Sequence, residues 1–131
     1  MEQKKPTIKI CEKFTAGQVS KHLSISECQC KCKYDDCYFL IMDRKTIYDF
    51  EKLRASCGNK PITVNSAHRC QHHNYDKDGV IHSAHMRGAA LDLEPPKGIG
   101  LHEFEHRARV FFDVVIIYED DNFIHVHNLL K

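Results

Sequence analysis

The sequence predicts an α+β domain, with a small and mainly antiparallel sheet and helices packed on one of its sides. Three observations support this fold class. An amphipathic helical segment comes early, segments typical of strands follow it, and the last two of these are close enough to form a hairpin. The 131 residues suffice for one hydrophobic core, so we expect a single domain over residues 1–131, in which residues 1–20 are peripheral.

The clearest helix is predicted between Asp43, a suitable N-cap, and Gly58, a typical C-terminal stop. Its apolar residues recur at helical spacing on one face: Ile47, Phe50, Leu53 and Cys57. A shorter helix is expected to begin after Ser24, whose side chain can cap it.

Strands are predicted in segments that are β-branched, rich in small residues, or alternating in polarity: 61–65, 88–93, 114–118 and 123–127. Residues 119–122 form a turn, which favours an antiparallel hairpin of the last two strands. Residues 66–82 are polar and are predicted to form a loop, whereas 101–109 are predicted to form a short helix.

Charge and composition argue against two classes of partner. A formal net charge of +1 gives no overall field that attracts nucleic acid or an anionic membrane. No apolar run is long enough to span a membrane, and the first residues lack the apolar stretch of a secretory signal. We therefore expect a protein made in the cytoplasm that binds neither nucleic acid nor membrane.

Ten His and seven Cys are many for this length, and both residue types bind metals. An odd number of Cys in a chain without a signal argues against a complete disulfide framework. A second, structural zinc is a hypothesis for the densest group of cysteines: Cys28, Cys30, Cys32 and Cys37. Their spacing differs from the paired C-x-x-C of zinc ribbons. The others are expected to be small buried residues: Cys11, Cys57 and Cys70.

A catalytic metal site is predicted from three residues. His85 comes just before a predicted strand and Asp92 lies within it, while the small Gly88 and Ala89 let the backbone approach a bound group. His125 lies on the last strand, which the hairpin can return to the same cleft. Two imidazoles and one carboxylate leave the fourth zinc position open for water, as catalytic zinc sites do.

These residues belong to a longer pattern, Ser-x-His-x-x-Gly-x-Ala-x-Asp, formed by Ser83, His85, Gly88, Ala90 and Asp92. The pattern resembles the signature of the D-alanyl-D-alanine carboxypeptidase family. That family includes phage and bacterial peptidoglycan peptidases, vancomycin-resistance dipeptidases and, by fold, the hedgehog signalling domain. Residues 61–70, which contain an Arg, and 123–127, which contain a His, are similar to the family's flanking strands. The resemblance extends over residues 20–129.

The resemblance implies that His85, Asp92 and His125 hold one catalytic Zn²⁺. It also implies that Arg69 grips a substrate carboxylate, a task that suits a bidentate guanidinium. Ser83 is expected to join Arg69 in binding the substrate. The implied fold is that of the hedgehog and DD-peptidase domains.

The resemblance leaves the general base open among three residues, because sequence cannot say which one reaches the reacting water. Glu119 lies six residues before the last ligand, as in the hedgehog-like pattern, and we favour it. Asp121 is its neighbour, and His127 stands two residues after the ligand, where many phage-type relatives carry Asp. Some relatives carry a carboxylate at the position of Asn122.

The implied function is zinc-dependent hydrolysis of peptidoglycan stem or cross-link peptides by a monomer, as a carboxypeptidase or an endopeptidase. A phage endolysin is the implied type, released by a holin or carried to the cell wall in a virion. The alternative is a catalytically inactive binding or structural module that keeps the zinc. Asn122 at a possible base position favours that alternative.

A rival motif is His102-Glu103-Phe104-Glu105-His106, which matches the H-E-x-x-H signature of zincin proteases. Zincins carry this motif inside a long helix, whereas residues 95–100 place it here in the first turn of a short one. We therefore expect these side chains to form a solvated helix face.

Overall fold

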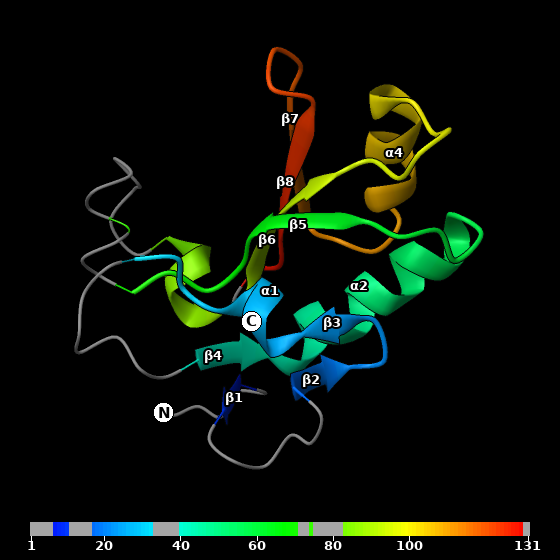
Figure 1. Ribbon diagram of the computed structural model, residues 1–131. Helices are drawn as coiled ribbons and strands as arrows, with labels where there is room; N and C mark the ends of the chain where they lie inside the picture. The colour runs from blue at the N-terminus through cyan, green and yellow to red at the C-terminus, as the bar shows by residue number, and fades with distance from the viewer. Residues whose placement is uncertain (1–6, 11–16, 33–39, 71–73, 75–82, 130–131) are drawn as a thin grey trace.

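The protein has an α+β fold, as predicted, in which a central sheet is flanked by helices and by smaller strand pairs (Figure 1). The computed structural model describes residues 7–10, 17–32, 40–70, 74 and 83–129. None of the helices in these ranges is both long and apolar enough to cross a membrane.

The elements follow one another as β1 (Thr7–Ile10), β2 (Gln18–Ser20), β3 (Leu23–Ser24), α1 (Ile25–Cys28), β4 (Leu40–Asp43), α2 (Arg44–Ser56), β5 (Thr63–Ser66), the 3₁₀ helix η2 (Ala84–Arg87), β6 (Ala90–Glu94), α4 (Leu101–Ala108), β7 (Val114–Tyr118) and β8 (Phe123–His127). Strands β7 and β8 have the predicted bounds. Strand β6 begins later than predicted, because Gly88 ends η2 in a left-handed conformation before the strand starts. Of the predicted loop 66–82, residues 71–73 and 75–82 lie outside the described ranges.

The two predicted helix starts are confirmed. The Ser24 side chain caps α1 in a capping box with Glu27. Asp43 occupies the N-cap of α2, where its carboxylate accepts a hydrogen bond from the Thr46 hydroxyl at 3.2 Å rather than from the backbone. The end of α2 also follows the sequence, since Gly58 adopts a φ of 76° that favours glycine.

The central sheet has the strand order β5–β6–β8–β7, and every neighbouring pair is antiparallel. The predicted hairpin of β7 and β8 is thereby confirmed. Between β6 and β8, Asp92 lies opposite His125 and Leu93 lies opposite Ile124. Because side chains alternate between the faces of a sheet, one face of this pair is apolar and the other carries Asp92 and His125.

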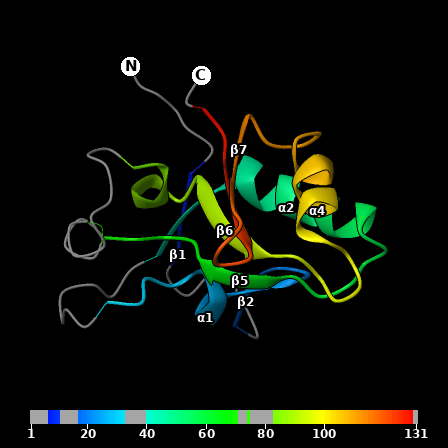
Figure 2. The same cartoon turned by 90° about the horizontal axis from the view of Figure 1, so that it is seen from above.

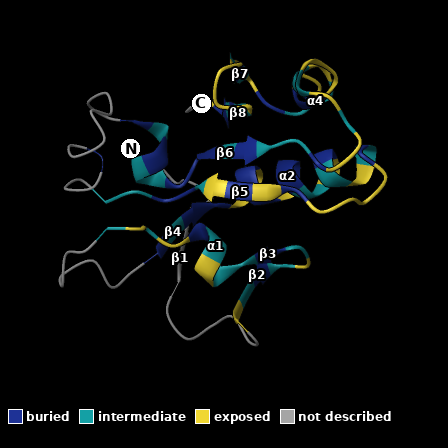
Figure 3. Ribbon diagram, turned by 45° about the horizontal axis from the view of Figure 1, so that its top comes forward, coloured by how far each residue is buried: buried dark blue, intermediate teal, exposed yellow. Residues whose placement is uncertain are grey.

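Helices α2 and α4 cover the apolar face. Their side chains Phe50, Leu53 and Phe104 are at most 1% exposed and pack in one core with Leu93 and Ile124. Figure 2 shows α2 and α4 on the same side of the sheet, so the predicted one-sided packing holds for these two helices. The short helix α1 instead contacts β3, β4 and β5. Figure 3 shows that α4 and β5 keep exposed residues on their outer sides.

Gly88 sits where only glycine fits. Its φ is 68°, and a Cβ built there would lie 2.0 Å from the Ile41 carbonyl oxygen. The Gly88 carbonyl accepts a hydrogen bond from the Asp43 N–H at 3.0 Å. The end of η2 is therefore pressed against β4, and this contact fixes where the following strand begins.

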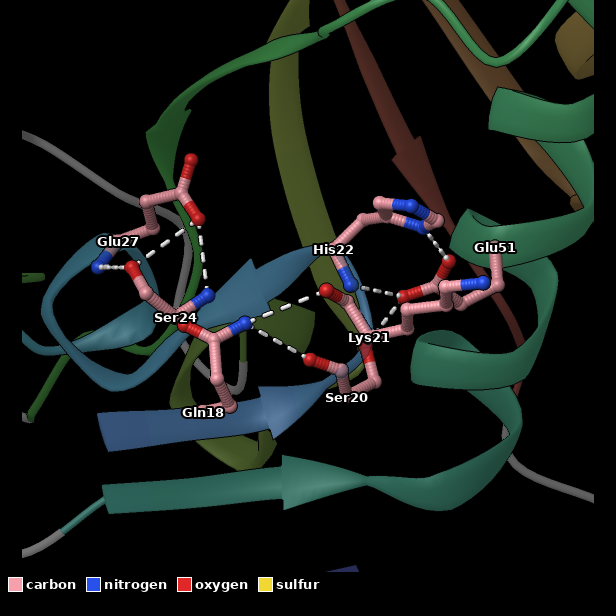
Figure 4. A network of polar contacts seen from close by, with 7 residues as sticks. All are labelled: Gln18, Ser20, Lys21, His22, Ser24, Glu27 and Glu51. Carbon is pink, nitrogen blue, oxygen red and sulfur yellow. Dashed lines mark hydrogen bonds and ion pairs between the residues drawn. The ribbon is translucent and has the colours of Figure 1, made fainter. Parts of the chain in front are cut away.

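Glu51 of α2 connects the strand pair β2–β3 to the rest of the fold (Figure 4). Its carboxylate accepts hydrogen bonds from the Ser20 hydroxyl, from the His22 backbone N–H at 2.8 Å and from His22 Nδ1 at 2.7 Å. Burial opposes ionisation of Glu51, but these hydrogen bonds outweigh it and lower the pKa of the carboxyl. The end of β2 and the turn that follows it are thus held on α2 by an ionised side chain.

Candidate metal centre

The pairing of β6 with β8 brings two predicted ligands together. Asp92 and His125 are direct partners across the strands, on the face opposite α2 and α4. Asp92 Oδ1 lies 3.0 Å from His125 Nδ1. Both side chains are largely buried, with 18% and 16% of their surface exposed.

The third predicted ligand, His85, comes from η2 and is 1% exposed. Its Nδ1 lies 2.6 Å from the Ala67 carbonyl oxygen. Because a carbonyl only accepts hydrogen bonds, His85 Nδ1 is the donor in this contact, and Nε2 faces Asp92 Oδ1, 3.3 Å away. A backbone carbonyl that orients a histidine in this way is a common partner of metal-binding histidines.

The donor atoms of His85, Asp92 and His125 all lie within 4.8 Å of one another. A tetrahedral zinc with ligands at roughly 2.0–2.2 Å holds them about 3.4 Å apart, close to the 3.3 Å between His85 Nε2 and Asp92 Oδ1. An imidazole nitrogen and a carboxylate oxygen are both ordinary zinc ligands, and at this distance one cation can bind to the two of them. The three residues therefore fit a metal ion.

The protonation of Asp92 agrees with this use. Burial alone would raise the pKa of its carboxyl, but hydrogen bonds with His125 and then His85 hold that pKa well below its usual range. The carboxylate is consequently ionised and able to act as a ligand.

Arg69 lies beside this centre, and its role in binding substrate stays a prediction. It follows β5, and its backbone N–H donates to the His85 carbonyl at 3.0 Å. Burial lowers the pKa of its guanidinium, and the nearby Asp92, Cys30 and Tyr118 act in the opposite direction. Within the described residues, the buried Arg69 Nε has no hydrogen-bond partner. The guanidinium can therefore bind an anionic group that approaches the metal centre.

Ser83 is 8% exposed and contacts the backbone of the predicted ligand His85. Its hydroxyl accepts a hydrogen bond from the His85 backbone N–H at 3.2 Å and caps η2. The contact thus fixes the start of the turn that carries His85, and the role of Ser83 in binding substrate stays a prediction.

The candidate bases lie in different environments. His127 contacts a predicted ligand, with its Nδ1 2.8 Å from His125 Nε2. Glu119 is exposed in the β7–β8 turn, and its carboxylate lies 3.1 Å from His102 Nε2 of α4. Asp121 is exposed in the same turn, and Asn122 adopts a left-handed φ of 55° there. Of these residues, His127 is the one described in contact with a predicted ligand.

The rival H-E-x-x-H residues lie on α4, away from the metal centre. His102 faces Glu105 at 3.7 Å, while Glu103 forms an ion pair with Arg107 at 2.8 Å. His102, Glu103 and His106, all of them described, are not among the groups whose donor atoms converge. This motif is a solvated helix face, as expected.

The cysteines cluster differently from the prediction. Three sulfur atoms lie within 4.8 Å of one another: Cys30, Cys32 and Cys70. Cys28 is wrong as a member, because it is buried in the core, where burial raises the pKa of its thiol to about 12. Cys70 is partly exposed rather than buried, while Cys57 is buried as predicted. Cys37 and Cys11 lie outside the described residues.

Two further residues contribute to the centre that sequence reasoning did not single out. Tyr118 stacks on Phe123 with ring centroids 4.7 Å apart and interacts electrostatically with Arg69. The Ala67 carbonyl orients His85. Tyr118 could have been found from strand alternation, because it pairs with Phe123, two residues from His125 on the same face. A backbone carbonyl leaves no such signal.

Comparison with known proteins supports the resemblance seen in the sequence. A family model described as Peptidase M15 matches residues 21–127, a range that includes His85, Asp92 and His125. Among curated proteins, none matches the chain. The matched range covers most of the chain and all of the central sheet. The chain therefore belongs to the peptidase M15 family of zinc-dependent metallopeptidases.

Proposed function

We propose that the protein is a zinc-dependent peptidase that hydrolyses peptidoglycan stem or cross-link peptides, as a carboxypeptidase or an endopeptidase. The observation that carries this proposal is the convergence of His85, Asp92 and His125, with the guanidinium of Arg69 beside them. Two imidazoles and one carboxylate are a common ligand set of catalytic zinc in peptidases. We further propose that the enzyme acts as a monomer.

In the proposed hydrolysis, each residue of the site has a separate role. Zinc, when bound by the three ligands, supplies a Lewis acid and lowers the pKa of a bound water to about 7. Arg69 binds the substrate carboxylate and so orients the scissile bond. His127, in contact with His125 at 2.8 Å, accepts a proton from the attacking water at an imidazole nitrogen and returns it to the leaving amine.

A second candidate function is a zinc-containing module without turnover. The pairing of Glu119 with His102, together with Asn122 at a possible base position, favours it. Both functions require zinc at His85, Asp92 and His125. They differ because only the first one includes hydrolysis of a peptide bond.

Replacing His85 with Ala tests the metal site, with His102→Ala as the matched control. His85→Ala is expected to remove the zinc bound there and to abolish hydrolysis of purified peptidoglycan, because it deletes a ligand. His102→Ala is expected to retain both. Elemental analysis and chromatography of the released peptides measure the two effects. If zinc is bound through His85 but no peptidoglycan is hydrolysed, the inactive module is favoured. If only His102→Ala loses zinc, the proposed site at His85, Asp92 and His125 is contradicted.

Arg69→Lys tests how the substrate is held. Charge-assisted hydrogen bonds contribute about 1.5–3 kcal/mol, so KM for a stem peptide with a free C-terminal carboxylate is expected to rise about 10- to 100-fold. The same peptide with an amidated C-terminus should be affected far less. Steady-state kinetics on both peptides measure this difference, and an equal effect on the two would rule out recognition of the carboxylate.

The base is tested by comparing His127→Ala with Glu119→Gln. Removing a general base lowers kcat by about 10²- to 10⁴-fold, which we expect for His127→Ala with zinc content unchanged. Glu119→Gln should stay close to the unsubstituted protein. Single-turnover rates and zinc content give the answer, and the opposite order of the two variants would assign the base to Glu119.

A further inference from the structure

A second group of metal-binding side chains lies outside the site described above. The sulfur atoms of Cys30, Cys32 and Cys70 lie within 4.8 Å of one another. They come from two chain segments that are distant in sequence, one after α1 and the other after β5. Neither segment is helix or strand at these positions. The pairing of helices or strands therefore does not explain why the three thiols lie close together.

The spacing of the sulfurs fits a tetrahedral metal. Zinc–sulfur bonds of about 2.3 Å place tetrahedral ligands about 3.8 Å apart. Cys70 Sγ lies 3.7 Å from Cys32 Sγ, whereas a disulfide would require about 2.05 Å. All three side chains are partly exposed, so a metal ion can reach them.

A backbone N–H and a guanidinium lie near the sulfur of Cys30. The Cys70 backbone N–H donates to Cys30 Sγ at 3.3 Å, and the Arg69 guanidinium interacts electrostatically with Cys30. Burial raises the pKa of the Cys30 thiol, and the backbone hydrogen bonds from Cys70 and Cys32 offset this only in part. A bound cation would supply the remaining stabilisation of the thiolates.

We propose that Cys30, Cys32 and Cys70 bind a second Zn²⁺ with a structural role, separate from the metal held by His85, Asp92 and His125. This zinc joins the segment after α1 to the segment that carries Arg69, which already share a hydrogen bond from the His68 N–H to the Cys28 carbonyl at 3.1 Å. Soft thiolate ligands select zinc over magnesium or calcium. The fourth ligand comes from outside these three cysteines.

Cobalt substitution tests the proposal without reference to peptidase activity. Thiolates bound to Co²⁺ give an intense charge-transfer band in the near ultraviolet, which a site of two His and one Asp cannot give. The reduced full-length chain, stripped of metal and loaded with Co²⁺, is expected to bind about two ions and to show this band. Cys70→Ser and Cys32→Ser are each expected to lose the band and about one ion.

Two controls separate this site from the one proposed above. His85→Ala should lose about one ion but keep the charge-transfer band, and Cys57→Ser, a cysteine outside the cluster, should keep both ions and the band. Absence of the band in the reduced unsubstituted chain would overturn the proposal, whether or not the His85 site holds metal. A band that survives Cys70→Ser and Cys32→Ser would overturn it equally.

Discussion

The antiparallel pairing of β6 with β8 is the interaction on which both the core and the metal centre depend. One register places Leu91, Leu93 and Ile124 on the face that packs against the helices and sets Asp92 opposite His125 on the other. Burying each large apolar side chain contributes about 1.5–3 kcal/mol. A slip by one residue would turn the apolar side chains away from the core and part the two ligands. Core packing therefore enforces the geometry of the site.

The third predicted ligand, His85, depends on a second constraint, the tight turn before β6. Ser83 holds the turn's start, Gly88 ends it against the Ile41 carbonyl, and the Ala67 carbonyl orients the His85 ring. The contacts of Ser83, His85 and Gly88 thus give a physical reason for the presence of each of these residues in the sequence pattern. The turn also links His85 to Arg69 through a backbone hydrogen bond, so the residue proposed to bind the substrate is positioned by the ligand segment itself.

Periodic elements could be predicted from the sequence and contacts between distant segments could not. The apolar spacing of α2 and the alternation of β8 are local signals. By contrast, Cys70 lies near Cys32 across a separation that leaves no pattern in the sequence, so the predicted cysteine group lacks Cys70 and includes the buried Cys28. The distance of Glu119 from His125 along the chain favours it as the base, but the contact of its side chain with His102 of α4 leaves no signal in the sequence. Spacing across a turn does not determine which side chains meet.

We propose that one zinc ion binds among His85, Asp92 and His125. Anomalous diffraction at the zinc absorption edge, from crystals of the protein purified without added metal, tests it most directly. We expect an anomalous peak bounded by these three side chains, with distances of about 2.0–2.2 Å to imidazole nitrogens and a carboxylate oxygen. Zinc at His102 and His106 with no peak among the three residues would contradict it.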